Sequence, residues 1–306
     1  MESDTIGFVG IGNAGWPMAA NLTKHGYRVI VHDLDHDRVE RFAAEHGSLG
    51  TRTLSELADV DVLFTSVFDD RSVREVLLGS GPLADRLRPG TVVIDTSSSD
   101  PTGTRKLGEE LAERGIHLVD AGVSQRVLGG RESGQITFMV GGDDEAALKR
   151  AVAILELISA HVFEVGRLGA GHAMKTLNNY ISACGLMAAL DGLMIGFRYG
   201  LDPATMLDVL NESTGRNFST EQTLKYHSLP RNFDTGYTIE LLVKDLRIAA
   251  GLAGTVQFES DLFGLVCDRF AETLADIGGD LDLTASLLHW EHLSGQELPA
   301  SALTTS

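Results

Sequence analysis

The sequence is poor in several residue types, and each shortage excludes a class of protein. It has two cysteines in 306 residues, Cys184 and Cys267, too few for a disulfide-stapled domain and without the spacing of a metal site. Lysine and arginine number 25 against 43 aspartates and glutamates, so the net charge is −18. Nucleic acids and anionic membranes attract net basic surfaces, so we expect neither as a partner. A local basic pocket for a small anionic substrate remains open.

Targeting and membrane-spanning patterns are also missing. Met1-Glu2-Ser3-Asp4 has neither the positive charge nor the apolar stretch of a signal peptide, and no apolar run approaches the roughly 20 residues of a membrane span. We therefore expect a cytoplasmic protein with reduced cysteines. At about 100–200 residues per domain, the length predicts two domains or one large one.

Two kinds of segment follow one another along the chain. In the first half, short β-branched runs alternate with helical stretches, which predicts parallel strands joined by crossover helices. The predicted strands are Thr5–Gly10, Arg28–Asp33, Val62–Val67, Thr91–Asp95, His117–Asp120, Ile136–Gly141 and Val162–Val165. From Ala170 onward, Leu, Ala and Met recur at helical spacing. The sequence thus predicts an α/β domain over residues 1–166 and an all-α domain over residues 167–306.

A glycine-rich loop lies between the first predicted strand and the helix that follows it. Gly10-Ile11-Gly12-Asn13-Ala14-Gly15 has the G-x-G-x-x-G spacing in the required context. The first glycine permits the turn, the second lets a pyrophosphate approach the backbone, and the third lets the helix pack against the sheet. N–H groups at the helix start attract the phosphates. We predict that these six residues bind a dinucleotide, the alternative being a purely structural turn.

The acidic residue after this loop indicates which dinucleotide is bound. Asp33 ends the second predicted strand, 18 residues after Gly15, close to the roughly 20 expected for a carboxylate that bonds the adenosine ribose. Its charge repels the 2′-phosphate of NADP, and the next residue is Leu34 and not an arginine. Arg38 and Arg41 lie a helical turn or more further on and could swing toward such a phosphate. NAD is the predicted cofactor, and NADP is the less favoured alternative.

Three further blocks follow the glycine loop, which itself continues as Met18-Ala19-x-Asn21-Leu22. They are Asp120-Ala121-Gly122-Val123-Ser124, Gly169-x-Gly171-x-x-x-Lys175-x-x-Asn178-Asn179 and Val243-Lys244-Asp245-Leu246-Arg247. In this order the blocks resemble the β-hydroxyacid dehydrogenases, a family that includes 3-hydroxyisobutyrate dehydrogenase. The resemblance implies a Rossmann-type domain, an all-helical second domain entered by a long helix near Ala170, and catalysis in the cleft between them. It also implies homodimers or homotetramers built through the helical domains.

The third block suggests how a proton is moved. Lys175, Asn178 and Asn179 share one face of a predicted helix. Hydride transfer at a carbinol needs a group that takes or gives the hydroxyl proton, and a lysine of lowered pKa does this near neutral pH. The resemblance implies that Lys175 is this acid/base and that Asn179 positions the substrate. We predict that Asn178, on the same face, binds the substrate as well. The alternative is a solvated helix face, although adjacent asparagines are poor helix formers.

The second block would bind the substrate. In the family, a serine and two glycines contact the substrate carboxylate; here they are Ser124 and, in place of the glycines, Gln125-Arg126, while Gly122 replaces a proline. We predict that Ser124, Gln125 and Arg126 bind the substrate. Arg126 could pair with a carboxylate or sulfonate through two hydrogen bonds, or it could face solvent.

Four more residues match family positions along the cofactor. Ser98 matches the hydroxyl that faces the nicotinamide, Val67-Phe68 stands where the family has Leu-Pro, and Lys244 matches a lysine that reaches the cofactor from the helical domain. The alternative for Lys244 is a surface pair with Asp245. No metal site is expected, because His172, three residues before Lys175, has no second ligand at a useful spacing.

The resulting prediction is an NAD(P)-dependent oxidoreductase that transfers a hydride between nicotinamide and a small 3-hydroxy acid or its semialdehyde. One alternative is a reductase of another anionic aldehyde, such as a sulfonated one, which Arg126 alone suggests. A second is a non-catalytic nicotinamide-binding scaffold, which the altered Gln125-Arg126 loop suggests. The presence of both Lys175 and Asn179 favours catalysis over the scaffold.

Overall fold

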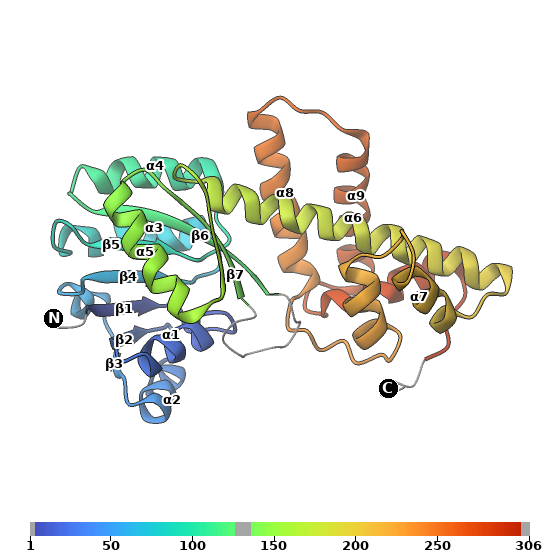
Figure 1. Ribbon diagram of the computed structural model, residues 1–306, viewed down its shortest axis with the longest axis horizontal. Coiled ribbons are helices and arrows are strands. Elements are labelled where there is room, and N and C mark those ends of the chain that lie inside the picture. The colour runs from blue at the N-terminus through green and yellow to red at the C-terminus, as the bar shows by residue number, and fades with distance from the viewer. Residues whose placement is uncertain (1–3, 126–135, 301–306) are drawn as a thin grey trace. The chain divides into compact units, whose positions relative to one another are not determined.

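The structure, a computed structural model, describes residues 4–125 and 136–300. The chain divides into two compact units (Figure 1). The first contains the described residues up to Lys175, and the second begins at Thr176. This division falls inside helix α6 (Ala170–Tyr199), whereas the sequence predicts a domain boundary after residue 166.

The described residues of the first unit form an eight-stranded sheet in the order β3-β2-β1-β4-β5-β6-β7-β8. The strands are β1 (Thr5–Val9), β2 (Arg28–His32), β3 (Leu49–Thr51), β4 (Val62–Thr65), β5 (Val92–Asp95), β6 (His117–Gln125), β7 (Ile136–Gly142) and β8 (His161–Gly166). The strand order reverses between β1 and β4, and at such a point open α/β sheets bind their ligands. The glycine loop leaves β1 at this reversal.

Two features of this sheet differ from the sequence prediction. β7 runs antiparallel to β6, although the alternating pattern predicted parallel strands, and the edge strand β3 was not predicted. β6 also continues five residues beyond Asp120, because residues 121–125 pair with residues 136–140 of β7. Gly122 and Ser124 are weak strand formers, so this extension depends on the partner strand and not on local propensity.

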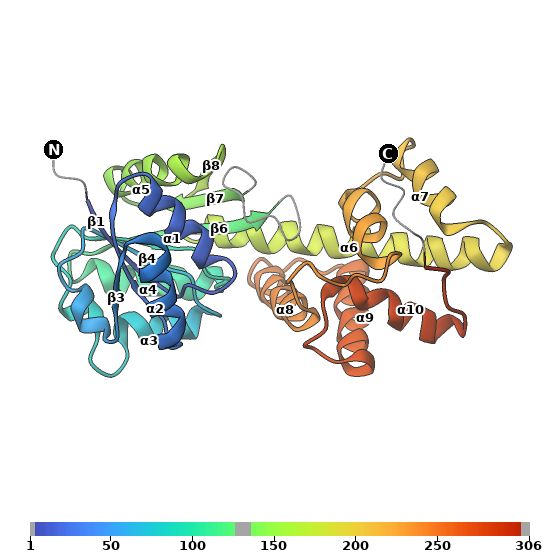
Figure 2. The ribbon, with the colours of Figure 1, turned by 90° about the horizontal axis from the view of Figure 1, so that it is seen from below.

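Helices cover both faces of the sheet (Figure 2). On one face, α1 (Gly15–Lys24), α2 (His36–His46) and α5 (Glu145–Ile158) pack on alternate strand residues such as Phe8 and Phe64. On the other face, α3 (Asp70–Leu78) and α4 (Pro101–Ala112) pack on the intervening residues, with the short helical turns η1 (Leu54–Leu57) and η2 (Leu83–Asp85) nearby. Burial on both faces explains the apolar strands.

Part of the acidic excess caps helices. The side chains of Asp35, Asp69, Asp100, Asp144 and Asp202 each accept a backbone N–H at the start of a helix. A carboxylate at this position satisfies an unpaired donor and interacts favourably with the helix dipole. These aspartates therefore have a structural role that composition alone does not reveal.

The second unit is helical in its described part. After α6 come α7 (Pro203–Asn211), the π-helical η3 (Ser219–Ser228), α8 (Ile239–Thr255), α9 (Asp261–Ile277), the turn η4 (Leu283–Ala285) and α10 (Ser286–Ser294). Its core gathers Leu190 and Leu193 of α6 with Leu246 and Phe270. By length and apolar composition α6 could cross a membrane, but 44% of its most apolar window is buried inside the protein. Part of α6, including Leu190 and Leu193, therefore lies in the core of the second unit.

Candidate active site

The glycine loop has the geometry that a pyrophosphate requires. Gly10 has φ +89°, and a side chain there would overlap the carbonyl of Ser66; one at Gly15 would overlap the carbonyl of Gly10. A side chain at Gly12 would meet no atom within 4 Å, so the space in front of this residue is open. The three positions therefore provide a turn, an open approach and a close helix contact, which fits a dinucleotide above the start of α1.

Asp33 is held next to this loop. Its Oδ2 accepts the N–H of Ile11 at 2.9 Å, and its Oδ1 accepts the N–H of Asp35 at 2.9 Å. Arg38 forms ion pairs with both Asp33 and Asp35 at 3.3 Å, so its guanidinium is bound to carboxylates here. Asn13 and Ala14 are exposed between the loop glycines. An adenosine ribose at this place would meet a carboxylate that the backbone already orients.

Buried hydrogen bonds hold the two loops predicted to lie along the cofactor. Asp95, at the end of β5, accepts hydrogen bonds from the Thr65 hydroxyl at 2.9 Å and the Ser97 N–H at 3.0 Å. The Ser97 hydroxyl in turn accepts the N–H of Val67 at 2.9 Å. Ser98, next in the chain, is partly exposed. Phe68, in place of the family's proline, is 52% exposed.

One side of β6 faces the first turn of α6. A side chain at Gly122 would come within 2.6 Å of Cβ of Lys175 and 2.7 Å of the carbonyl oxygen of Gly171. Residues two apart on a strand share a side of the sheet, so Asp120 and Ser124 point the same way as Gly122. Lys175 and Ser124 are both partly exposed. The strand reaches Gln125, while Arg126 lies outside the described residues.

Asp120 fixes the start of α6. Its two carboxylate oxygens accept the N–H groups of Gly169 and His172, each at 2.7 Å. Asp120 is fully buried, and burial raises the pKa of its carboxyl group, while His172 and these two N–H groups act in the opposite direction. Lys175 follows His172 by almost one helical turn. The backbone that carries Lys175 is therefore tied directly to β6.

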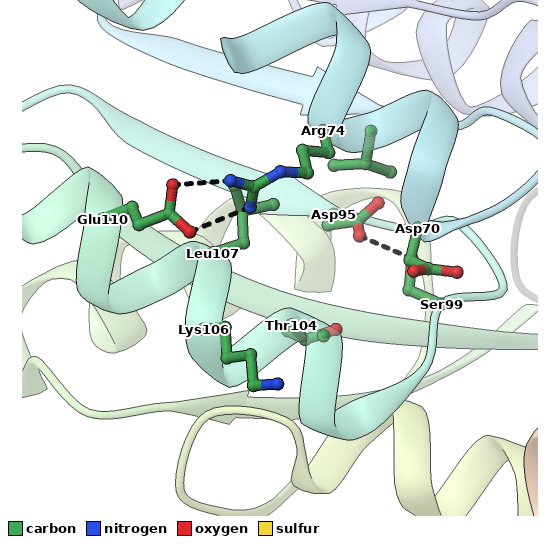
Figure 3. Close-up of a pocket in the computed structure, with 10 residues that line it drawn as sticks. Asp70, Arg74, Asp95, Ser99, Thr104, Lys106, Leu107 and Glu110 are labelled. Atoms are coloured by element: carbon green, nitrogen blue, oxygen red, sulfur yellow. Dashed lines mark hydrogen bonds and ion pairs between the residues drawn. The ribbon is translucent and has the colours of Figure 1, made fainter. Parts of the chain in front are cut away.

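A pocket of about 240 Å³ lies between α3 and α4 of the first unit (Figure 3). Asp95, Ser99 and Thr104 lie on its inner side, and Arg74 binds Glu110 across it through two hydrogen bonds of 2.9 and 2.7 Å. None of the residues that the sequence analysis assigned to catalysis or cofactor binding lines this pocket. It is therefore distinct from the candidate active site.

In the second unit, Asn179 belongs to a buried polar cluster. Its Nδ2 donates to Oδ2 of Asp245 at 2.5 Å and to the Tyr237 hydroxyl at 3.2 Å, and the Tyr237 hydroxyl donates to the same carboxylate oxygen at 2.8 Å. Asn178, partly exposed, donates to Oδ1 of Asn179 at 3.2 Å. Nζ of Lys244 lies 3.9 Å from Oδ1 of Asp245. Three predicted site residues, Asn178, Asn179 and Lys244, are thus linked through Asp245.

The polar loop before η3 caps that helix. The side-chain oxygen of Asn217 accepts the N–H groups of Ser219 at 2.8 Å and Thr220 at 3.2 Å. Arg216 pairs with Glu221 at 3.5 Å. These contacts explain the polar residues of the loop.

The comparisons with known proteins agree with this geometry. Residues 5–166 match a family described as the NAD-binding domain of 6-phosphogluconate dehydrogenase, and residues 169–290 match one described as the NAD-binding region of NADP-dependent 3-hydroxyisobutyrate dehydrogenase. The 2-(hydroxymethyl)glutarate dehydrogenase of Eubacterium barkeri is 33% identical over 96% of this chain and 97% of its own. The chain belongs to the β-hydroxyacid dehydrogenase family.

Two further relatives extend the comparison. The NAD-dependent L-serine dehydrogenase of Pseudomonas aeruginosa is 31% identical over 80% of this chain and 83% of its own. The structure of 3-hydroxyisobutyrate dehydrogenase from Mycobacterium tuberculosis with L-serine superposes with a TM-score of 0.81 at 29% identity, covering 94% of this chain and 99% of that one. As a member of this family, the protein is an NAD-dependent oxidoreductase that transfers a hydride between the cofactor and a small 3-hydroxy acid or its semialdehyde.

The structure also reveals polar residues to which sequence reasoning assigned no role. Asp95 and Asp120 are paired on neighbouring strands, and Asp245 and Tyr237 surround Asn179. The available signal was the aspartate that ends each of two consecutive predicted strands, Asp95 and Asp120, because parallel strands bring their carboxyl ends to one edge.

Proposed function

We propose that Lys175 is the general acid/base of the hydride transfer. The observation that carries this role is the contact between the first turn of α6 and the side of β6 that presents Gly122 and Ser124. A substrate whose carboxylate is bound at Ser124 would lie on the same side of the strand as Lys175. NAD held by the glycine loop and Asp33 would supply the hydride acceptor for oxidation, and NADH would supply the hydride donor for reduction. In the oxidative direction, Nζ of Lys175 takes the hydroxyl proton as the carbinol C–H bond breaks.

The proposed substrate is a 3-hydroxy acid with a primary alcohol. The compounds named for the relatives are 3-hydroxyisobutyrate, L-serine and 2-(hydroxymethyl)glutarate. Each carries a hydroxymethyl group on the carbon next to a carboxylate, and oxidation of that group yields an aldehyde. In this proposal Ser124, Gln125 and Arg126 bind the carboxylate, whereas Asn178 and Asn179 orient the carbinol from the helix that carries Lys175. In the same proposal, Lys244 binds the cofactor.

Substitution of Lys175 tests the proposal. Lys175→Ala is expected to lower kcat by about 10²- to 10⁴-fold, the usual contribution of a positioned acid or base, with unchanged affinity for NADH measured by fluorescence. Lys149→Ala is the matched control, because Lys149 is an exposed lysine of α5 paired with Glu145. Turnover by Lys175→Ala within tenfold of wild type would refute the assignment.

A substrate panel tests the chemical class. We expect NAD reduction with 3-hydroxyisobutyrate, L-serine or 2-(hydroxymethyl)glutarate and none with the matching alcohols that lack the carboxylate. Ser124→Ala should raise KM for the carboxylate substrate with a smaller effect on kcat. Faster turnover of sulfonated aldehydes than of carboxylated ones would instead favour the sulfonate alternative. Turnover of no member despite NADH binding would favour the scaffold.

The proposal includes a homodimer or homotetramer formed through the second unit and a location in the cytoplasm. Apolar side chains on that unit are exposed by 63–86%, and they include Ile181, Ile195 and Tyr199 of α6 and Val256 and Phe258 after α8. In this proposal these side chains contribute to the contacts between subunits. Light scattering should give a multiple of 32.8 kDa, and Ile181→Glu with Ile195→Glu should lower it. A monomeric wild-type protein would refute the proposed oligomer.

A further inference from the structure

A buried histidine connects two parts of the first unit that the reaction would use. Asp95 and Asp120 are paired neighbours on β5 and β6. His172 approaches both: Nε2 lies 3.8 Å from Oδ2 of Asp95, and Nδ1 lies 3.8 Å from Oδ2 of Asp120. All three residues are at most 1% exposed. Burying two carboxylates is costly unless neighbouring groups pair or hydrogen-bond with them, as the groups around Asp95 and Asp120 do.

Each carboxylate holds a different segment. Asp95 accepts hydrogen bonds from Ser97 and from the hydroxyl of Ser99 at 3.0 Å, and so shapes the turn that contains Ser98. Asp120 accepts the N–H groups at the start of α6 and so fixes the turn that leads to Lys175. One link between these two parts of the unit is the hydrogen bond from Nε of Arg105, on α4, to the carbonyl of Leu168 at 3.0 Å.

The ring of His172 supplies a second link, which is buried. Its Nδ1 is 2.9 Å from the hydroxyl oxygen of Thr104, and its Nε2 is 3.3 Å from the carbonyl oxygen of Asp95. Thr104 is on α4, the helix that begins directly after the turn of Ser98, and its hydroxyl donates to the carbonyl of Asp100. Because the backbone of His172 also bonds Asp120, one residue contacts β5, α4 and β6.

Close contacts between α6 and the sheet restrict movement of this helix relative to the strands. A side chain at Gly171 would overlap the carbonyl of Met139 and come within 2.9 Å of Oδ2 of Asp120. Gly122 meets the same turn from β6, as described above. Any shift of His172 is therefore transmitted to the first turn of α6 and to Lys175.

We propose that His172 is a positioning residue, which fixes the helical turn of Lys175 relative to the turn of Ser98, the residue that the family resemblance predicts to face the nicotinamide. It acts through hydrogen bonds and packing and touches no reacting atom. The inference rests on the proposed role of Lys175. Reactions that depend on a near-attack geometry lose about 10²-fold for a misplacement of about 1 Å, so a small shift is measurable in kcat.

The test compares two substitutions of His172 in the full chain at a temperature where each variant is folded by circular dichroism. His172→Leu should lower kcat at least tenfold, with KM for substrate and affinity for NADH within threefold of wild type. His172→Gln, which keeps polar atoms near Thr104 and Asp95, should recover part of this loss. In His172→Leu, the isotope effect on kcat, measured with substrate deuterated at the carbinol carbon, should be larger than in wild type, because the chemical step becomes more rate-limiting.

A matched control separates positioning from stability. His289 is likewise buried, at 5% exposed, and bonds Asp276 at 2.8 Å, but it lies on α10 of the second unit. His289→Leu should lower the melting temperature and leave kcat and the isotope effect unchanged. If His172→Leu does not fold, Thr104→Val replaces it, removing the hydroxyl beside Nδ1 at similar volume, with an expected two- to fivefold loss in kcat and a raised isotope effect.

The outcomes distinguish this inference from the proposed function. If Lys175→Ala is inactive while folded His172 variants, or Thr104→Val in their place, keep wild-type kcat and isotope effect, the positioning role is wrong and the role of Lys175 stands. If Lys175→Ala turns over like wild type, the role of Lys175 fails, and the positioning inference fails with it.

Discussion

The carboxylate of Asp33 accepts a hydrogen bond from the backbone N–H of Ile11 at 2.9 Å. This bond joins the end of β2 to the glycine loop after β1, so the acidic residue and the backbone predicted to bind the phosphates are positioned together. The remaining bonds of Asp33, to Asp35 and Arg38, orient the same carboxylate from α2. The side chain predicted to select NAD over NADP is therefore held by the glycine loop itself.

Asp33→Asn should weaken NAD binding and reduce the preference of the enzyme for NAD over NADP. The amide retains an acceptor but loses the charge that repels a 2′-phosphate, and it releases Arg38 from its ion pair. We expect kcat/KM for NAD to fall about tenfold, worth about 1.4 kcal/mol, while that for NADP rises. Asp37→Asn, an exposed position on α2, is the control. An unchanged NAD to NADP ratio would contradict this role.

Alanine at two loop glycines should have opposite consequences. At Gly12 a methyl group meets no protein atom within 4 Å, so Gly12→Ala should melt like wild type but bind NADH at least tenfold more weakly, because the methyl occupies the phosphate approach. At Gly15 the methyl overlaps the carbonyl of Gly10, so Gly15→Ala should melt at a lower temperature or fail to fold. Thermal melts and NADH titrations separate the two. Equal losses of stability would contradict the open site at Gly12.

Removal of the Tyr237 hydroxyl should destabilise the second unit. Burial, followed by the nearby carboxylate of Asp245, raises the pKa of Tyr237 well above its usual range, so the hydroxyl stays a donor. Tyr237→Phe removes its bond to Asp245 and should lower the free energy of unfolding by about 1–3 kcal/mol. Tyr226→Phe, at a 42% exposed tyrosine, should change it by less than about 0.5 kcal/mol. Urea denaturation measures both, and equal effects would exclude a special role for Tyr237.

Two histidines of α10 bond the carboxylate of Asp276, and this should make the stability of the protein depend on pH in the acidic range. Hydrogen bonds with His289 and then His292 lower the pKa of Asp276. A carboxyl group with a lower pKa in the folded state stabilises that state above its unfolded pKa of about 3.9, and this contribution is lost as pH falls through the folded pKa. The melting-temperature gap between wild type and Asp276→Asn should therefore be full at pH 5 and shrink below pH 4. Asp280→Asn should follow wild type, and a constant Asp276→Asn gap would refute the coupling.

The strands show which parts of the sheet can be predicted from local sequence and which cannot. β1, β2, β4 and β5 have apolar cores that local pattern identifies, because strands buried on both faces consist of continuous apolar runs. The extension of β6 and the direction of β7 were not predictable in this way. Val123 pairs with Phe138, and Ser124 with Thr137, across an interval in the chain that no local pattern connects.

The sequence by itself determined the family, the two kinds of architecture, the glycine loop and its Asp33, because each depends on residues close together in the chain or on a motif of fixed spacing. It also singled out Lys175. Only the tertiary structure decided the surroundings of His172 and Asn179. The ring of His172 is buried between Asp95 and Asp120, and Asn179 meets an aspartate 66 residues away, because strand pairing and helix packing bring distant polar groups together inside an apolar core.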